Sequence, residues 1–282
     1  MNDDTHKTLN LQVDQGIARV GLDHGPINLL DRHMFVELSR LAAELAADDR
    51  VRVVILHSRN PLFFIAHFDV AQILRYPTDR VVSTVDLNPF HTLCEHFRTM
   101  PKATIAVIEG RVGGGGSEIA LSCDMRFALR GQAVFNQPEV ALGIIPGGSG
   151  TVRLSRLLGR SRALEAVLGC DDVDAQTAEA WGWVNRSLPA DQLWPHVNRL
   201  AARIASFPPH AVAAAKAAVL RGEKEVHADL LAEGAAFQAT LAGPGVRATM
   251  EQFLARGGQT LAGEMRLGEL AAELGTPPGP AL

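Results

Sequence analysis

The chain of 282 residues is near the upper limit for one hydrophobic core, so we expect one main domain with an appendage. Charged residues make up 21% of it and the formal net charge is −4, a balance that disfavours a surface for nucleic acid or acidic lipid. No apolar run is long enough to span a membrane, and residues 1–7 are too polar for a secretory signal. The three cysteines are far apart and form no C-x-x-C pair, which disfavours a disulfide framework, and we expect a cytoplasmic protein.

Strand and helix patterns alternate through the first part of the chain. Residues 9–13 and 17–22 flank a polar turn and predict an antiparallel hairpin. Asp31 is expected to cap a helix, because apolar residues follow it at the three-and-four spacing of one buried face. The patterns then predict a strand, a helix and a fully buried strand, at residues 51–57, 87–97 and 103–108. This alternation predicts an α/β core with a largely parallel sheet.

A run of four glycines, residues 113–116, follows the buried strand and precedes Ser117 and Glu118. Because residues 119–123 predict the start of a buried helix, amides near Gly115 are expected to be unpaired at its N-terminus, where the helix dipole favours negative charge. A thioester enolate carries such a charge. Glu139 adds a second carboxyl, a combination that suits acid/base chemistry on an acyl group. A tight connection between strand and helix is the structural alternative.

Two other glycine-rich motifs do not fit the sequence. The dinucleotide-binding pattern Gly-x-Gly-x-x-Gly lacks its last glycine, and no lysine follows a glycine as in a phosphate-binding loop. Around Ser149, Thr151 takes the place of the last glycine in the hydrolase pattern Gly-x-Ser-x-Gly. The sequence therefore predicts neither a nucleotide site nor a serine nucleophile.

Strand patterns end near Pro189, and helical spacing dominates the rest of the chain. Helices are predicted at residues 193–207, 211–220, 223–241 and 246–256. A further helix is expected at residues 260–274, before a segment rich in proline and glycine.

Residues 105–154, with the glycine run, Gln137-Pro138-Glu139 and the second glycine-rich segment 142–154, resemble the enoyl-CoA hydratase, or crotonase, family. The resemblance continues with less specific matches over about residues 10–256. It implies an α/β fold with a crotonase-like spiral of ββα units that carries the active site in residues 1–195. It also implies a helical C-terminal domain in residues 196–282, which covers the active site and makes trimer contacts.

The same resemblance implies that Glu118 and Glu139 are the catalytic pair. Hydration of a 2-enoyl thioester requires that water lose a proton as it attacks C3 and that C2 gain one. Glu118 is expected to be the base toward water and Glu139 the donor to C2, and the reverse assignment stays open because the two carboxyls can share protons. A first-turn helix glutamate and a loop acid are the structural alternatives.

By resemblance, the backbone N–H groups of Phe68 and Gly115 form the oxyanion hole, and Gly147 positions water or substrate. Further substrate-binding residues are expected at Ala66, Asp69, Val70, Leu142 and Arg256. His67 replaces a glycine of the family pattern and Phe68 a small residue. A solvent-exposed turn residue is the structural interpretation of His67, beside a functional one.

No metal and no cofactor is expected apart from the coenzyme A of the substrate. The spacing of His91, Glu95 and His96 is poor for zinc and favours core packing or surface. The expected partners are an acyl-CoA substrate and further copies of the chain, as a homotrimer or dimer of trimers, with no nucleic acid and no membrane.

The predicted function is the addition of water to a trans-2-enoyl-CoA, which gives a 3-hydroxyacyl-CoA. Double-bond isomerisation and thioester hydrolysis by the same family are alternatives, and the presence of both glutamates favours hydration. A non-catalytic acyl-CoA-binding or RNA-binding relative is the alternative of another class. The absence of a lysine-rich helix from the sequence disfavours RNA binding.

Overall fold

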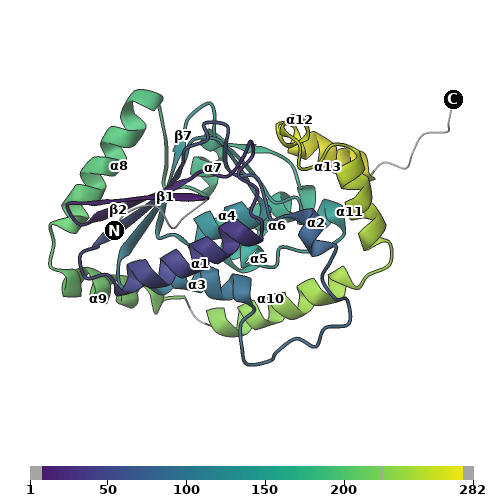
Figure 1. The fold of residues 1–282 in the computed structure, drawn as a ribbon, viewed down its shortest axis with the longest axis horizontal. Helices are drawn as coiled ribbons and strands as arrows, with labels where there is room; N and C mark the ends of the chain where they lie inside the picture. The colour runs from purple at the N-terminus through teal and green to yellow at the C-terminus, as the bar shows by residue number, and fades with distance from the viewer. Residues whose placement is uncertain (1–7, 224, 276–282) are drawn as a thin grey trace.

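The computed structural model describes residues 8–223 and 225–275, in which one large sheet is flanked by helices (Figure 1). The six strands of this sheet lie in the order β1-β2-β3-β5-β7-β10. β1 (Leu9–Asp14) and β2 (Ile17–Leu22) form the predicted antiparallel hairpin. The remaining strands run parallel: β3 (Val53–Ser58), β5 (Ala103–Ile108), β7 (Met125–Leu129) and β10 (Arg186–Leu188). Every residue of β5 is buried, as its apolar sequence predicts.

A second sheet has four short strands in the order β4-β6-β8-β9. They are β4 (Phe63–Ile65), β6 (Arg111–Gly113), β8 (Val134–Asn136) and β9 (Val173–Asp174). Three strands of the large sheet, β3, β5 and β7, are each followed along the chain by a strand of the small sheet and then by a helix. This repeat confirms the predicted spiral of ββα units.

Helices follow the strands along the chain. The longer ones are α1 (Arg32–Ala47), α3 (Pro89–Thr99), α4 (Gly114–Ser122), α5 (Gly150–Leu158), α6 (Arg160–Gly169) and α7 (Ala175–Trp181). Asp31 caps α1 as predicted, because its side chain accepts from Met34 N at 3.0 Å. The sequence patterns missed α2 (Val70–Ile73) and the 3₁₀ helix η1 (Glu139–Leu142), which are too short to show a helical period.

The C-terminal region is helical: α8 (Ala190–Ala205), α9 (Pro209–Leu220), α10 (Val226–Leu241), α11 (Val246–Ala255), α12 (Leu261–Glu264) and α13 (Leu267–Gly275). The predicted boundary between residues 195 and 196 falls inside α8, whose Leu193 and Val197 pack with Ile55 and Ile105 of the large sheet. The single helix expected at residues 260–274 is two helices. None of the described helices is long and apolar enough to cross a membrane.

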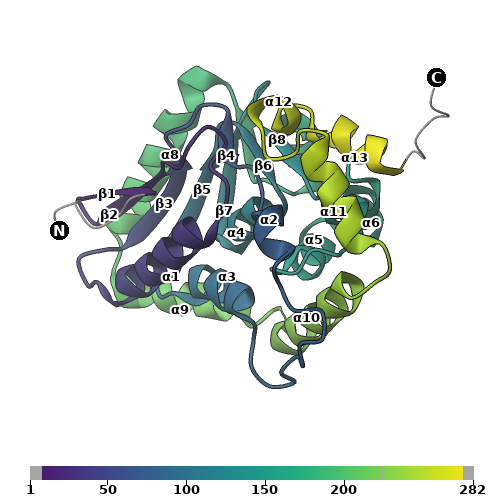
Figure 2. The ribbon, with the colours of Figure 1, turned by 45° about the vertical axis from the view of Figure 1, so that its right-hand side comes forward.

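The later helices surround the centre of the molecule. Figure 2 shows α10, α11 and α12 arranged around α2, α4 and α5, on the side away from the β1–β2 hairpin. Val70 of α2, Leu142 of η1, Phe253 of α11 and Leu270 of α13 share one buried apolar cluster. The C-terminal helices α11 and α13 therefore share one apolar cluster with the short helices α2 and η1.

Candidate active site

Three of the four glycines lie within α4 rather than before it, and Gly113 ends β6. Gly114, Gly115 and Gly116 are the first residues of α4, which corrects the expected helix start at residue 119. A Cβ on Gly116 would lie 2.6 Å from both Cβ and the carbonyl oxygen of Ile65, so only glycine lets α4 pack against β4. Close packing, and not a turn, is the reason for glycine at this position.

Glu118 lies on α4 with 2% of its surface exposed. Its Oε1 accepts hydrogen bonds from the N–H groups of Gly148 and Gly150, at 2.8 and 2.7 Å. Burial raises the pKa of Glu118 well above its usual value, and the negative charges of Glu139 and Glu233 add to the rise. The two N–H donors act in the opposite direction without cancelling it.

Glu139 is the first residue of η1 and is 8% exposed. Its Oε2 accepts from Gln137 Nε2 at 3.2 Å. Burial raises the pKa of Glu139 to about 7, although its own backbone N–H and the charge of His67 lower it. Gly114 has a φ of +43°, and a Cβ there would lie 2.7 Å from Glu139 Oε1. A glycine in the first turn of α4 therefore allows the carboxyl of η1 to approach this helix.

Both carboxyls line one cavity of about 610 Å³. Two negative charges in an apolar enclosure repel each other and lose hydration, so the pair retains a proton at a pH where isolated glutamates are ionised. The cavity thus offers a proton donor and a proton acceptor side by side.

Phe68 and Gly115 line the same cavity. A Cβ on Gly115 would lie 3.2 Å from Phe68 Cβ, so the two residues are close neighbours. The His67 carbonyl accepts from Leu30 N at 3.0 Å, and the two ends of a trans peptide point in opposite directions, so the Phe68 N–H points away from Leu30. Among the described residues the Phe68 N–H has no acceptor, and Gly115 is in the helical first turn, whose amides lack intrahelical partners.

Aromatic rings form much of the cavity wall. Phe68 lies 5.7 Å from Phe90 and 6.4 Å from Tyr76 between ring centroids, and Phe35 lies 6.0 Å from Phe90. Gly147 also lines the cavity, and a Cβ there would lie 2.6 Å from the ring of Phe237. Apolar residues are thus prominent in the lining, which also includes the charged residues Arg32, Arg80 and Asp86 besides the two glutamates.

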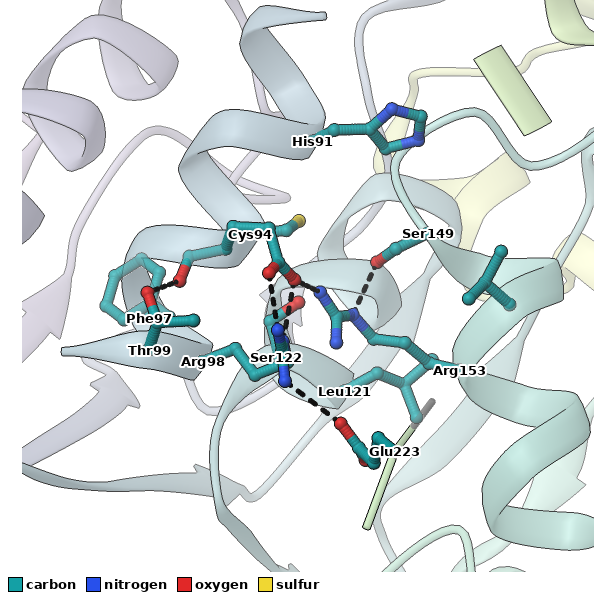
Figure 3. Close-up of polar contacts among 12 residues, drawn as sticks. His91, Cys94, Phe97, Arg98, Thr99, Leu121, Ser122, Ser149, Arg153 and Glu223 are labelled. Carbon is teal, nitrogen blue, oxygen red and sulfur yellow. Dashed lines mark hydrogen bonds and ion pairs between the residues drawn. The ribbon is translucent and has the colours of Figure 1, made fainter. Parts of the chain in front are cut away.

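An ion-paired arginine holds the segment 147–150, whose amides bind Glu118, through a hydrogen bond to Ser149. Arg153 Nε donates to Ser149 Oγ at 2.7 Å, and Arg98 Nη1 donates to Glu223 at 3.0 Å (Figure 3). Glu95 accepts from both arginines, at 2.6 to 2.7 Å. The start of α5 therefore sits in a charged network that reaches back to α3.

Glu233 of α10 supports the same segment from the other side. Its Oε2 accepts from Ser149 N at 2.7 Å and from His91 Nε2 at 2.9 Å, and its Oε1 accepts from Thr151 N at 2.9 Å. A carboxylate at the N-terminus of α5 also complements the helix dipole. His91 is thus a packed core residue, and the described residues hold no group of three or more potential metal ligands.

The remaining predicted substrate residues lie outside the cavity lining. Ala66 packs with Ile27, and its N–H donates to the Ile27 carbonyl. Asp69 caps α2 by accepting from Ala71 N at 2.9 Å. Val70 and Leu142 belong to the buried cluster described above, and Arg256 Nη1 donates to the Glu273 carbonyl at 2.6 Å. The geometry gives these five residues structural partners, and their predicted contacts with substrate stay predictions.

The interpretation of His67 as an exposed turn residue is wrong. Only 4% of it is exposed, its Nδ1 lies 2.8 Å from the Phe68 carbonyl oxygen, and its Nε2 lies 2.9 Å from Glu264 Oε1. Neither Glu264 nor Glu233 was predicted from the sequence. The one signal for them was a carboxylate within a helical stretch of mostly apolar residues, which is too common to predict a role.

A family model for enoyl-CoA hydratase/isomerase matches residues 12–260, and the chain belongs to this family. It is 33% identical to the short-chain-enoyl-CoA hydratase of Clostridium acetobutylicum, over 70% of this chain and 74% of that protein. It is 34% identical to the crotonyl-CoA hydratase of Syntrophomonas wolfei, with the same two coverages. The crystal structure of a candidate enoyl-CoA hydratase from Streptomyces avermitilis superimposes with a TM-score of 0.87 at 37% identity, over 96% of this chain and 99% of that one.

Proposed function

We propose that the protein adds water to a trans-2-enoyl-CoA and forms a 3-hydroxyacyl-CoA. The observation that carries this proposal is the pair of buried carboxyls, Glu118 and Glu139, in one cavity with the amides of Phe68 and Gly115. Hydration needs two proton transfers and a site for a developing enolate oxygen, and this set of groups supplies all three.

In this mechanism Glu118 takes the proton of the attacking water. Gly148 and Gly150 hold its Oε1, which leaves Oε2 to accept that proton. Glu139 gives a proton to C2. Burial raises the pKa of both carboxyls, and that of Glu118 well above its usual value, so the reverse assignment of base and donor stays open. The N–H groups of Phe68 and Gly115 donate to the thioester oxygen as it gains charge, and each is worth about 2.7–4 kcal/mol in such a site. Gly147, which lines the cavity, is assigned the positioning of the water or the substrate.

The names of the two sequence relatives and the ring-lined cavity support short acyl chains as substrates. The purified protein should therefore hydrate trans-2-enoyl-CoA thioesters with short acyl chains faster than those with long ones. Loss of the conjugated absorbance, with a product heavier by one water, would be the expected result.

Other products of the same assay would contradict the proposal in distinct ways. A shifted double bond without added water would identify an isomerase, and free coenzyme A a thioester hydrolase. Binding of the thioesters without any turnover would favour the non-catalytic acyl-CoA-binding protein.

We also propose that the protein is cytoplasmic and assembles as a trimer or a pair of trimers. Its three cysteines are free and buried, as suits a reducing compartment. No residue of α9 is buried within the single chain although its sequence is mostly apolar. Leu157, Phe207 and Val219 are exposed large apolar side chains that line one cleft of about 430 Å³. Such a surface supports contact with another copy.

A further inference from the structure

The turn between α11 and α12 holds the loop that follows Phe68. Gln259 Oε1 accepts from Val70 N at 2.8 Å and from Ala71 N at 3.3 Å. Gln259 Nε2 donates to Asp69 Oδ1 at 2.9 Å. One side chain from the C-terminal region therefore binds three consecutive residues next to the proposed oxyanion donor.

A carboxylate connects this turn to His67. Glu264 Oε1 accepts from Gln259 N at 2.8 Å and lies 2.9 Å from His67 Nε2. His67 Nδ1 lies 2.8 Å from the Phe68 carbonyl oxygen, so both ring nitrogens face acceptors and both must donate, as an imidazolium does. Burial alone would lower the pKa of His67, but the charge and hydrogen bond of Glu264 outweigh it and raise the pKa to about 9.

The opposite side of the loop is held by Leu30, two residues before α1. Leu30 N donates to the His67 carbonyl at 3.0 Å, and the Leu30 carbonyl accepts from Asp69 N at 3.1 Å. Phe68 therefore lies between His67 and Asp69, whose backbone groups are both hydrogen-bonded to Leu30. Since its own carbonyl is held by His67, both peptide groups that flank Phe68 are restrained, including the one that carries its N–H.

The imidazolium also lies beside the catalytic pair. The position of a Cβ on Gly114 is 3.1 Å from His67 Cβ and 2.7 Å from Glu139 Oε1. The charged groups that face His67 are Glu264 of α12 and Glu139 of η1, with Arg111 beyond Glu264. Glu264 lies after residue 260, where the family match ends.

We propose that the buried pair of His67 and Glu264 positions the Phe68 N–H toward the enolate oxygen, so that the segment from Gln259 to Glu264 is a working part of the active site. This inference rests on the proposed function. Neither side chain is assigned a contact with substrate, so both are positioning residues. Release of the pair would let the donor shift, and a displacement of about 1 Å can cost about 10²-fold in rate.

Glu264→Gln is the first test, because it keeps an oxygen that can accept from Gln259 N but removes the charge that keeps His67 protonated. The expected result is a fall in kcat of at least about tenfold with KM changed by less than about threefold, since the lost interaction acts on the transition state. Glu264→Asp should recover part of the loss. The matched control is Glu269→Gln on α13, whose side chain is 78% exposed and which should keep the wild-type kcat.

Two substitutions of His67 separate its hydrogen bonds. In His67→Asn the side-chain amide can replace Nδ1 and donate to the Phe68 carbonyl, whereas in His67→Gln it can replace Nε2 and donate to Glu264. Because both bonds are needed to fix Phe68, each variant should lose kcat at least about tenfold.

Hydrogen exchange provides a readout that does not depend on turnover. The peptide that covers residues 67–71 should exchange faster in Glu264→Gln than in wild type, and at the wild-type rate in Glu269→Gln. Wild-type kcat or wild-type exchange of this loop in folded Glu264→Gln would overturn the inference. If the wild type hydrates no enoyl-CoA, the proposed function fails by itself, and the exchange of residues 67–71 alone decides whether Glu264 holds the loop.

Discussion

Burial gives Glu118 and Glu139 properties that exposed glutamates lack. Burial raises the pKa of both carboxyls, the charge of Glu139 adds to the rise at Glu118, and the charge of Glu233 adds to both, so the pair retains a proton near neutral pH. The sequence predicted both residues because they lie in local motifs. It could not predict Glu233, since nothing in its own segment shows that it meets the start of α5.

This shared proton predicts the pH dependence of hydration. One carboxyl must be ionised and the other neutral, so kcat/KM should fall as the pH drops below about 7, where the pair gains a second proton. The groups that face Glu139 are Glu118, Glu233 and the protonated His67. A kcat/KM profile measured with a short enoyl-CoA checks this, and a profile that stays flat down to about pH 5 would contradict it.

The Phe68 side chain predicts acyl selectivity. Its ring packs against Phe90 and Tyr76 in the cavity wall, while the proposed oxyanion donor is its backbone N–H. Phe68→Ala keeps that N–H and widens the cavity, so the preferred acyl chain should become longer. Each methylene in such a pocket is worth about 1–3 kcal/mol. The ratio of kcat/KM values for long and short thioesters measures the change, and an unaltered ratio would mean that the acyl chain does not reach this ring.

At the scale of elements, close packing determines where α4 lies and where it begins. Gly116 touches Ile65 of β4, and this contact brings the first turn of α4 next to β4 and the loop that carries Phe68. The four glycines predicted a strand-to-helix transition, but the start of α4 at Gly114 depends on a neighbour about fifty residues earlier in the chain. Local periodicity in the sequence could not predict this helix start.

Gly116→Ala should therefore destabilise the protein. A Cβ 2.6 Å from the backbone oxygen of Ile65 forces α4 to shift, at a cost of about 1–3 kcal/mol, which exceeds the gain of up to about 1 kcal/mol in helix propensity. Gly169→Ala in α6 is the matched control, since its Cβ would meet nothing within 4 Å, and it should be neutral or stabilising. Midpoints of thermal unfolding compare the two, and equal shifts would contradict the packing argument.

Local patterns predicted some of the elements, and they missed the shortest helices. The hairpin of β1 and β2 and the capped α1 follow from patterns within six to sixteen residues. The helices α2 and η1 have four residues each, and neighbours from the C-terminal region fix them. The predicted boundary between residues 195 and 196 lies inside α8, because the helical spacing of this segment does not show that it packs on the large sheet.

At the scale of the molecule, segments that lie more than two hundred residues apart in the sequence meet beside the candidate active site. Leu30, before α1, and Glu264, in α12, hold the loop of Phe68 from opposite sides. Sequence resemblance predicted the spiral fold, which is confirmed, and it named Glu118, Glu139, Phe68 and Gly115, which line one cavity. It could not show which distant side chains support the site, because such contacts depend on tertiary packing and not on local spacing.

The exposed apolar surface predicts assembly. Native mass measurement at micromolar concentration should give three or six copies, because α9 and the cleft at Leu157 remain uncovered in a single chain. A monomer that turns over enoyl-CoA at full rate would contradict this prediction.

The central claim is that Glu118 and Glu139 act together to add water to an enoyl-CoA. It is tested most directly by the hydration rates of wild type, Glu118→Gln, Glu139→Gln and the double variant, with thioester binding measured for each. Each single change should reduce kcat at least about 10²-fold while binding survives, and the double change should add little, because the two carboxyls work as a unit. Wild-type turnover in either single variant, or losses that multiply in the double variant, would contradict the account.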